Sequence, residues 1–302
     1  MSSINTNLSA MTALQALKST QNAMNKNQNQ ISTGLRVGEA SHNASYWSIS
    51  TQMKSDNGAL SAVKDSIKQS KAMINTFTSA MDKTLGYLNK MKEGLVAARQ
   101  PGADLAKIQS EFDAHIAGMK SAANSAQFNG QNWLQSNGSA VELVTSYDGQ
   151  ANKVGTLSIT TADTQLFGVA SGAADYNVGL LKDVVTIDVK TAGDGADNTY
   201  GNADDTLDGS VIDGFLTKID QAIADVTKGS AMLGANKALL ETQEEFIGVL
   251  SDSLTAGVSA FIDADMNEAS TRNQALQTQQ QLGVQALSMA NQNSQMILKL
   301  FQ

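Results

Sequence analysis

The chain has 302 residues, enough for about two domains with a buried core. It carries 21 basic and 29 acidic residues, and the net charge of −8 argues against nucleic-acid binding by phosphate neutralisation. Because there is no cysteine, disulfides, thiol nucleophiles and Cys-ligated zinc or iron–sulfur sites are excluded.

The first residues lack the features of a cleaved signal peptide. Residues 1–7 have neither a basic n-region nor an apolar h-region. Along the chain, no uninterrupted apolar run approaches the roughly 18 to 20 residues of a membrane-spanning helix. We therefore expect no membrane insertion, and we expect that any export proceeds without a cleaved signal peptide.

Residues 10–35 show the periodicity of a helix that packs along another helix. Apolar residues recur at intervals of seven, with a second series at the alternate position: Ala10, Leu17, Met24 and Ile31, then Leu14 and Leu35. The last segment repeats this pattern at Ala275, Leu282, Met289 and Met296, with Leu300 near the end. A helix of about 35 residues is about 50 Å long, so we expect the two ends to pair as long helices.

Three further helices are predicted, over residues 56–99, 104–127 and 211–255. The first carries an apolar stripe formed by Ile67, Ile74, Phe77, Met81, Leu85 and Leu88. Pro101, which Gly102 follows, predicts a sharp turn between the first two helices.

After Phe128-Asn129-Gly130 the sequence changes character. Short β-branched runs around residues 141–144 and 156–161, bounded by Gly, Asn and Asp, predict strands and hairpins. Residues 190–210 combine Gly with several Asp and predict a polar loop that packs no core. Its spacing does not fit an EF-hand, so a solvated acidic loop is favoured over a calcium site.

These elements predict a mainly α fold. Both termini form long antiparallel coiled-coil helices, the inner part is a helical bundle, and a small β-rich region lies in the middle. We expect a terminal core domain over residues 1–45 plus 258–302. We expect an inner helical domain over 46–135 plus 211–257 and a variable outer region over 136–210.

The sequence offers little to catalysis. Its two histidines, His42 and His115, belong to no H-E-x-x-H motif, and no phosphate-binding glycine loop is present. We interpret both histidines as surface or packing residues. Lys64, Lys68 and Lys71 are interpreted as a solvated helix face rather than a polyanion patch. We therefore predict no enzyme and no catalytic, cofactor-binding or metal-binding residues.

The segment Ile4–Ser50 resembles the start of bacterial flagellins, in which an Ile-Asn-Thr-Asn opening leads through a heptad helix to a Gly-Leu-Arg motif, here Gly34-Leu35-Arg36. The closing segment, from Ile262-Asp263-Ala264-Asp265-Met266 to Phe301, is similar to the family's C-terminus, and Phe128-Asn129-Gly130 also matches. The sequence His-Asn-Ala-Ser-Tyr-Trp after Arg36 looks like the alphaproteobacterial branch.

The resemblance implies a secreted structural subunit that polymerises into the helical flagellar filament used for swimming. It also implies export through the flagellar type III apparatus and terminal segments that fold into a coiled coil on assembly. The implied self-assembly core is Ile4, Leu8, Met11, Leu14, Leu17, Met24, Ile31, Leu35, Leu282, Met289, Met296, Ile297 and Leu300. The residues that match the family motifs are Gly34, Leu35, Arg36, Phe128, Asn129, Gly130, Asp263 and Asp265.

The implied partners are other flagellin subunits, in a homopolymer with or without paralogous flagellins. An export chaperone and junction and cap proteins are also implied, and no nucleic acid. The family's innate immune receptor epitope resembles Arg-x-Arg-Glu-Leu-Ala-Val, and it is altered here at Lys90, Lys92 and Gly94, with Glu93 kept. Lysine cannot reproduce a bidentate arginine contact, so we expect weak or absent receptor activation.

Two other functions remain open from the sequence. A hook–filament junction protein shares the end segments but does not polymerise extensively, and the complete tail favours the filament subunit. A secreted coiled-coil adhesin would be a stable monomer with ordered ends. An enzymatic insert is disfavoured because residues 136–210 are short and hold no zinc-protease motif.

Overall fold

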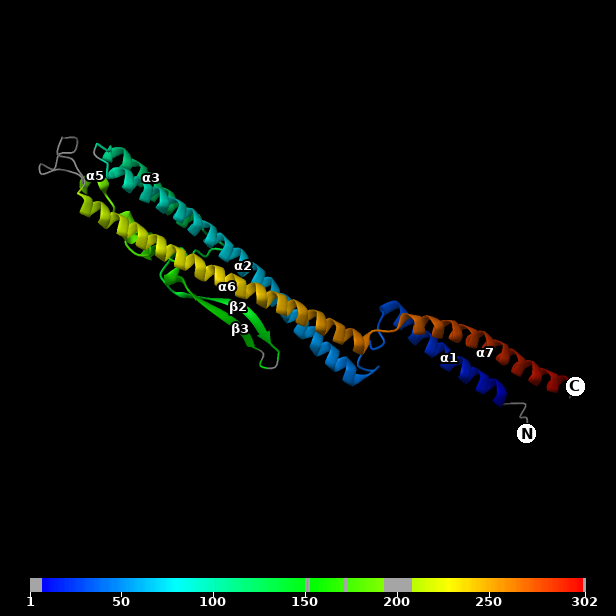
Figure 1. The fold of residues 1–302 in the computed structure, drawn as a ribbon. Coiled ribbons are helices and arrows are strands. Elements are labelled where there is room, and N and C mark those ends of the chain that lie inside the picture. Colours follow the sequence, from blue (N-terminus) through cyan, green and yellow to red (C-terminus); the bar gives the residue numbers. More distant parts are fainter. Residues whose placement is uncertain are drawn as a thin grey trace. The chain divides into compact units, whose positions relative to one another are not determined.

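A computed structural model describes residues 7–100, 102–149, 151, 153–170, 173–192 and 208–300; side chains are not described for residues 170, 173 and 293–300. The elements in chain order (Figure 1) are α1 (Leu8–Thr33), α2 (Ala44–Ala98), α3 (Leu105–Ser125), β1 (Gln135–Ser136), β2 (Ala140–Asp148), β3 (Lys153–Thr160), the 3-10 helix η1 (Thr161–Asp163), β4 (Phe167–Ala170), β5 (Ala173–Asp175), α4 (Lys182–Val185), α5 (Val189–Ala192), α6 (Gly209–Ile262) and α7 (Met266–Leu300). The predicted mainly helical fold with a small β region is confirmed.

The chain divides into two compact units. Unit 1 consists of Met1–Gly58 and Leu250–Gln302, and unit 2 of Ala59–Val249. Helices α2 and α6 contribute to both units. The three-part domain division expected from the sequence stays a prediction.

In unit 1, α1 and α7 run side by side and antiparallel (Figure 1). The Asn7 side chain donates to the Ala290 carbonyl at 3.0 Å, and the Asn27 side chain donates to the Ala269 carbonyl at 2.8 Å. The start of α1 therefore lies beside the later part of α7, and the predicted pairing of the two ends is confirmed.

The less exposed positions of both helices follow the alternating three- and four-residue spacing of a coiled coil. We call these positions the seam: Ala10, Ala13, Leu17, Thr20, Met24, Asn27 and Ile31 on α1, and Ala269, Asn273, Leu276, Gln280, Gly283, Leu287 and Ala290 on α7. The seam on α7 alternates Leu276 and Leu287 with small or polar residues, and Gly283 is what lets Leu17 approach. A Cβ at position 283 would lie 3.1 Å from Leu17 Cδ1.

The sequence prediction of the seam is therefore only half right. The series of Ala10, Leu17, Met24 and Ile31 is confirmed, because these residues are buried or half-buried. The alternate position given to Leu14 is wrong, and so is the series on α7: Leu14, Ala275, Leu282 and Met289 are all exposed. The side chains of Met296 and Leu300 lie outside the described ones. Periodicity selected the face of α7 that holds Leu282 and Met289, whereas α1 packs on a neighbouring face where Leu276 and Leu287 are interspersed with small and polar residues.

Unit 2 is built on α2, α3 and α6, whose buried apolar residues also repeat at heptad spacing. On α2 these are Leu60, Val63, Ile67, Ile74, Phe77, Met81, Leu88, Met91, Leu95 and Ala98. The predicted stripe is confirmed apart from Leu85, which is only half-buried.

Ion pairs fix the antiparallel register of α2 and α6 in unit 2. Lys71 Nζ lies 3.1 Å from Glu244 Oε2, and Lys92 Nζ lies 2.6 Å from Asp220 Oδ1. The hydrogen bond from Lys71 to Glu244 raises the pKa of the Lys71 ammonium above its ordinary value. Since these pairs are partly exposed, they orient the helices more than they stabilise them.

The observed helices extend beyond the predicted ones. The second helix starts at Ala44 rather than residue 56, and α6 ends at Ile262 rather than residue 255. Pro101 lies outside the described residues, but α2 ends and α3 begins on either side of it. The Asp104 side chain caps α3 by accepting from the Lys107 amide at 3.1 Å, and hydrogen bonds from Lys107 lower the pKa of Asp104.

The predicted hairpin is the antiparallel pair of β2 and β3, and a second sheet joins β1, β4 and β5. The segment 161–189 is not purely an outer region, because Leu166, Phe167, Leu181 and Val184 are fully buried. The Val189 amide donates to Gln109 Oε1 of α3 at 2.7 Å, which ties this segment to the helices.

Most of the predicted acidic loop 190–210 lies outside the described residues. Its first residues belong to α5, and its last two begin α6. At that end, hydrogen bonds from Ser210 lower the pKa of Asp208.

Among the described helices, α6 is long and apolar enough by length and composition to cross a membrane. It holds an 18-residue window of mean hydropathy 1.3, of which 17% is buried. Ser, Thr and Asp interrupt this window, so it is not an uninterrupted apolar run. Such a window is weak support for a membrane span, since core helices pass the same test.

Candidate functional site

The α1–α7 pair leaves several large apolar side chains exposed. We call five of them the outward apolar residues: Leu8, Met11 and Leu14 on α1 and Leu282 and Met289 on α7, with 57 to 77% of each exposed. Val284 is also exposed, and the sequence analysis missed it because it lies outside the interval of seven. Clusters of exposed apolar residues on a folded protein mark interaction surfaces.

The other predicted assembly residues lie elsewhere. Met24 is buried in the seam, and Leu17, Ile31 and Leu35 are half-buried. Ile4 lies outside the described residues, as do the side chains of Met296, Ile297 and Leu300. The structure thus separates the described members of the predicted set into seam residues and outward residues.

Little charge surrounds the outward apolar residues of α1. The sequence up to residue 38 holds no Asp or Glu, and α1 itself carries only Lys18 and Lys26. The remainder of the α1 surface is Asn, Gln, Ser, Thr and Ala. Repulsion between two copies brought together at this surface is therefore small.

Where α1 ends and α7 begins, the motif Gly34-Leu35-Arg36 meets Asp263, which lies more than 200 positions later in the sequence. Residues 34–37 and 261–265, which we call the paired links, form a short antiparallel contact with a bridge between Leu35 and Asp263. The Ala264 amide donates to the Gly34 carbonyl at 2.9 Å, and the Arg36 amide donates to the Ile262 carbonyl at 2.7 Å.

Gly34 has a structural reason to be glycine. It ends α1 with a φ of 72°, and its amide donates to the Gln30 carbonyl at 2.9 Å. Helices commonly end on a residue in this left-handed conformation, which glycine adopts without a side-chain clash.

The Arg36 side chain holds the paired links to the end of α6. Its Nη2 donates to the Phe261 carbonyl at 3.0 Å, and its guanidinium lies 5.9 Å from the centre of the Tyr46 ring. Tyr46 in turn stacks on Phe261, with ring centres 5.5 Å apart. A cation that donates to the last carbonyls of a helix is favourable, because those carbonyls lack helical partners.

The two aspartates of the closing motif lie between α6 and α7. Asp265 caps α7 by accepting from the Asn267 amide at 2.9 Å, while the Asp263 amide donates to the Ser259 carbonyl at 2.9 Å and its side chain accepts from the Ser259 hydroxyl. Together with Arg36, they fix where α6 stops and α7 starts.

Phe128-Asn129-Gly130 forms a tight turn just after α3. The Phe128 and Gln131 backbones exchange two hydrogen bonds of 2.9 and 3.0 Å. Asn129 and Gly130 have φ values of 51° and 77°, as the two central residues of a type I′ turn require. The motif is therefore a turn signal rather than a binding site.

At the predicted epitope, Lys92 pairs with Asp220, and Lys90 and Glu93 are exposed. Gly94 faces α3, where an added Cβ would lie 2.7 Å from Phe112 Cε1. Within the described residues, no group of three or more His, Asp or Glu could hold a metal ion. His115 lies beside the Tyr87 ring, with ring centres 5.7 Å apart.

Comparison with known families matches both ends of the chain. Residues 4–139 match the bacterial flagellin N-terminal helical region, and residues 216–301 match the bacterial flagellin C-terminal helical region.

Similar curated proteins match over the whole chain. Flagellin C of Rhizobium meliloti (strain 1021) is 40% identical over 322 residues, covering all of both chains. The flagellin of Brucella melitensis biotype 1 is 40% identical over 302 residues, covering 100% of this chain and 99% of that one.

One solved structure is similar in fold. A putative flagellar hook-associated protein from Vibrio parahaemolyticus superposes with a TM-score of 0.56 at 11% identity, over 74% of this chain and 100% of that one. At that identity the likeness shows the fold alone. The full-length matches to flagellins carry the assignment, and the chain therefore belongs to the bacterial flagellin family, the non-enzymatic subunits of the extracellular flagellar filament that serves motility.

Proposed function

We propose that copies of this chain join into the filament by burying the outward apolar residues of α1 and α7. The observation that carries this proposal is that these five large apolar side chains remain 57 to 77% exposed on the helix pair, although other large apolar residues pack in its seam. Burying one Leu or Met side chain contributes about 1.5 to 3 kcal/mol before the entropic cost of association.

The outward apolar residues lie on two helices, and we propose that those on α1 of one copy meet those on α7 of the next. When different surfaces of identical subunits meet, the contact does not close on itself unless the rotation forms a ring, and an open contact generates a helical filament. This supports a homopolymer, with paralogous flagellins able to join wherever their outward residues have the same pattern.

We expect an export chaperone to bind the outward apolar residues, because exposed apolar residues can cause aggregation before assembly. Limited proteolysis with and without a chaperone from the same operon checks this. Protection of the segment around Met289 is expected, and unchanged cleavage there would contradict it. Junction and cap proteins are proposed to bind the same helices at the two ends of a filament.

The experiment that tests the proposed polymerisation is seeded growth observed by electron microscopy. Intact monomer should extend filament fragments, and a variant without residues 1–35 should not, because it lacks α1 and its outward apolar residues. Stable monomers from both chains would reject the proposal and leave the hook–filament junction or adhesin role.

We further propose weak activation of the innate immune receptor that recognises the family's epitope. Lys92 is held by Asp220 at 2.6 Å, and a lysine offers no planar pair of donors to a partner. A receptor reporter assay with purified monomer measures this. Restoring arginine by Lys90→Arg with Lys92→Arg should raise the response, and a strong response to the unaltered chain would contradict the proposal.

A further inference from the structure

The chain contains three Asn-Gly pairs: Asn57-Gly58, Asn129-Gly130 and Asn137-Gly138. In such a pair the backbone nitrogen of the glycine can attack the side-chain carbonyl carbon of the asparagine, because glycine has no Cβ to hinder the approach. The attack closes a five-membered ring, a succinimide. It requires access to water and an asparagine side chain that is folded over the glycine amide. The reactivity of one dipeptide therefore depends on its local structure, which differs among the three pairs.

Asn57 lies within α2, and its side chain is directed away from the Gly58 amide. Its Nδ2 donates to Thr255 Oγ1 of α6 at 3.1 Å, and its Oδ1 accepts from the Ser251 hydroxyl of the same helix. Gly58 belongs to the interior of α2, where each amide is bound to the carbonyl four residues earlier. Closing the ring at Asn57 would require this part of α2 to unfold.

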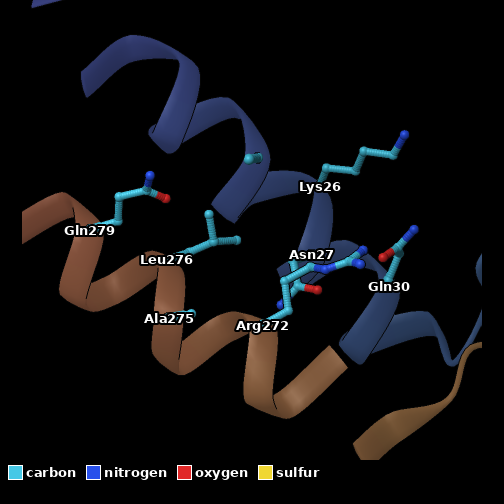
Figure 2. A pocket seen from close by; sticks show the side chains of 8 residues that line it. Lys26, Asn27, Gln30, Arg272, Ala275, Leu276 and Gln279 are labelled. Atoms are coloured by element: carbon cyan, nitrogen blue, oxygen red, sulfur yellow. The ribbon is translucent and has the colours of Figure 1, made fainter. Parts of the chain in front are cut away.

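Burial protects Asn27 of the seam. Only 2% of this residue is exposed, and Figure 2 shows its side chain directed from α1 toward α7, where Nδ2 donates to the Ala269 carbonyl at 2.8 Å. The next residue is Gln28, whose side chain hinders the attack. The seam therefore shields this amide from both water and the neighbouring backbone nitrogen.

Asn129 is exposed, but it lies in the tight turn after α3. Its φ is 51°, and two hydrogen bonds between the Phe128 and Gln131 backbones, of 2.9 and 3.0 Å, span the turn. In a type I′ turn the glycine nitrogen is directed away from the asparagine side chain. Closing the ring at Asn129 requires a rotation of the backbone that breaks both hydrogen bonds.

Asn137, between β1 and β2, has the arrangement that the attack requires. The residue is exposed, and its Oδ1 accepts from the Ser139 amide at 3.2 Å and from the Ser139 hydroxyl at 2.6 Å. The first of these bonds closes a ring of atoms that runs through Asn137 Cγ and the Gly138 nitrogen, so the side chain is folded over the Gly138 amide. Both donors also point at the oxygen on which negative charge develops when the nitrogen adds to Cγ.

We propose that Asn137 is a site of spontaneous deamidation, with water as the co-reactant. Hydroxide removes the amide proton of Gly138, the Gly138 nitrogen forms a bond to Asn137 Cγ, and the bond from Cγ to Nδ2 breaks. Nδ2 takes a proton from water and leaves as ammonia. Water then opens the succinimide at one of its two carbonyls and leaves aspartate or isoaspartate at position 137. No atom is oxidised or reduced, and the reaction does not depend on polymerisation.

The folded chain has room for the product. A carboxylate oxygen at position 137 accepts from the Ser139 donors as the amide oxygen does. Isoaspartate adds one carbon to the main chain just after β1, where the Ser136 hydroxyl donates to Thr161 Oγ1 at 2.9 Å. Either product adds a negative charge at an exposed residue.

The first test is peptide mass spectrometry of the purified full chain after incubation in water enriched in oxygen-18. Position 137 should gain the label first, well ahead of Asn129 and Asn57, and its conversion should be faster at higher pH because hydroxide removes the Gly138 proton. In the chain unfolded by guanidinium chloride the three pairs should convert at similar rates, since the dipeptide is the same. Equal conversion of the three pairs in the folded chain would overturn the proposal.

The second test is the Ser139→Ala variant, which removes the hydroxyl donor and keeps Gly138. Conversion at position 137 of the folded chain should slow about tenfold, as the loss of one hydrogen bond to a developing charge predicts. The rate in the unfolded variant should equal that of the unfolded unaltered chain. Ser158→Ala, at an exposed serine of β3, is the matched control and should convert like the unaltered chain. An unchanged rate in folded Ser139→Ala would also overturn the proposal.

Discussion

Two glycines of α2 show how single residues set the packing of this protein. Gly94 lies against Phe112 of α3, which is 1% exposed, and a Cβ there would be 2.7 Å from the ring. Gly86, two turns earlier on the same helix, has no atom within 4 Å of such a Cβ. The first glycine is required by packing, and the second only weakens the helix.

The two positions should respond oppositely to alanine. Gly94→Ala overpacks the interface with Phe112 and should destabilise unit 2 by about 1 to 3 kcal/mol. Gly86→Ala should stabilise it by about 0.5 to 1 kcal/mol, because the unfolded chain loses freedom and the helix loses nothing. Urea denaturation followed by circular dichroism measures both. Equal effects of the two substitutions would contradict this account of Gly94.

At the scale of elements, the paired links join the terminal helices to α2 and α6. Three backbone hydrogen bonds, Arg36 and the stack of Tyr46 on Phe261 hold them together. The sequence identified Gly34, Arg36 and Asp263 by resemblance only. Nothing in their local pattern indicated that the two links pair, because the pairing joins residues more than 200 positions apart.

Removing the Arg36 side chain should loosen the paired links without unfolding the helices. In Arg36→Ala, the Ala264 amide, which donates to Gly34 at 2.9 Å, should exchange with solvent faster, while amides in the middle of α6 keep their protection. Arg36→Lys should behave like the alanine variant, since lysine cannot donate and stack as a planar group. Hydrogen exchange with mass spectrometry checks this, and unchanged exchange at Ala264 would show that Arg36 does not hold the links.

The α7 seam shows where prediction from sequence reaches its limit. Apolar periodicity correctly gave the helices, their antiparallel pairing and the α1 series from Ala10 to Ile31. The periodicity rule failed on α7 because it assumes that the most apolar face of a helix packs against the neighbouring helix. In the structure Leu17 packs on Gly283, and Leu282 and Met289 are exposed. The rule also passed over Asn27, because it counts apolar residues alone.

At the scale of the whole molecule, two kinds of helix packing occur. Unit 2 buries its large apolar residues within the chain, as Phe77 and Trp133 do with ring centres 4.8 Å apart. Unit 1 buries a few large apolar residues, such as Met24, together with polar ones such as Asn27, and it leaves Leu8, Met11, Leu14, Leu282 and Met289 exposed. A unit that leaves its best apolar faces exposed gains stability when copies meet, which is how folding becomes coupled to assembly.

The most direct test places a charge on the outward apolar residues and measures filament growth. Leu14→Lys and Met289→Lys change exposed side chains, so the monomer should keep its helicity while seeded growth stops, because burying an unpaired charge is costly. Val154→Lys makes the same change at a similarly exposed apolar residue of the hairpin and should grow like the unaltered chain. Normal growth of the Leu14 and Met289 variants would contradict the claim that these faces join the subunits.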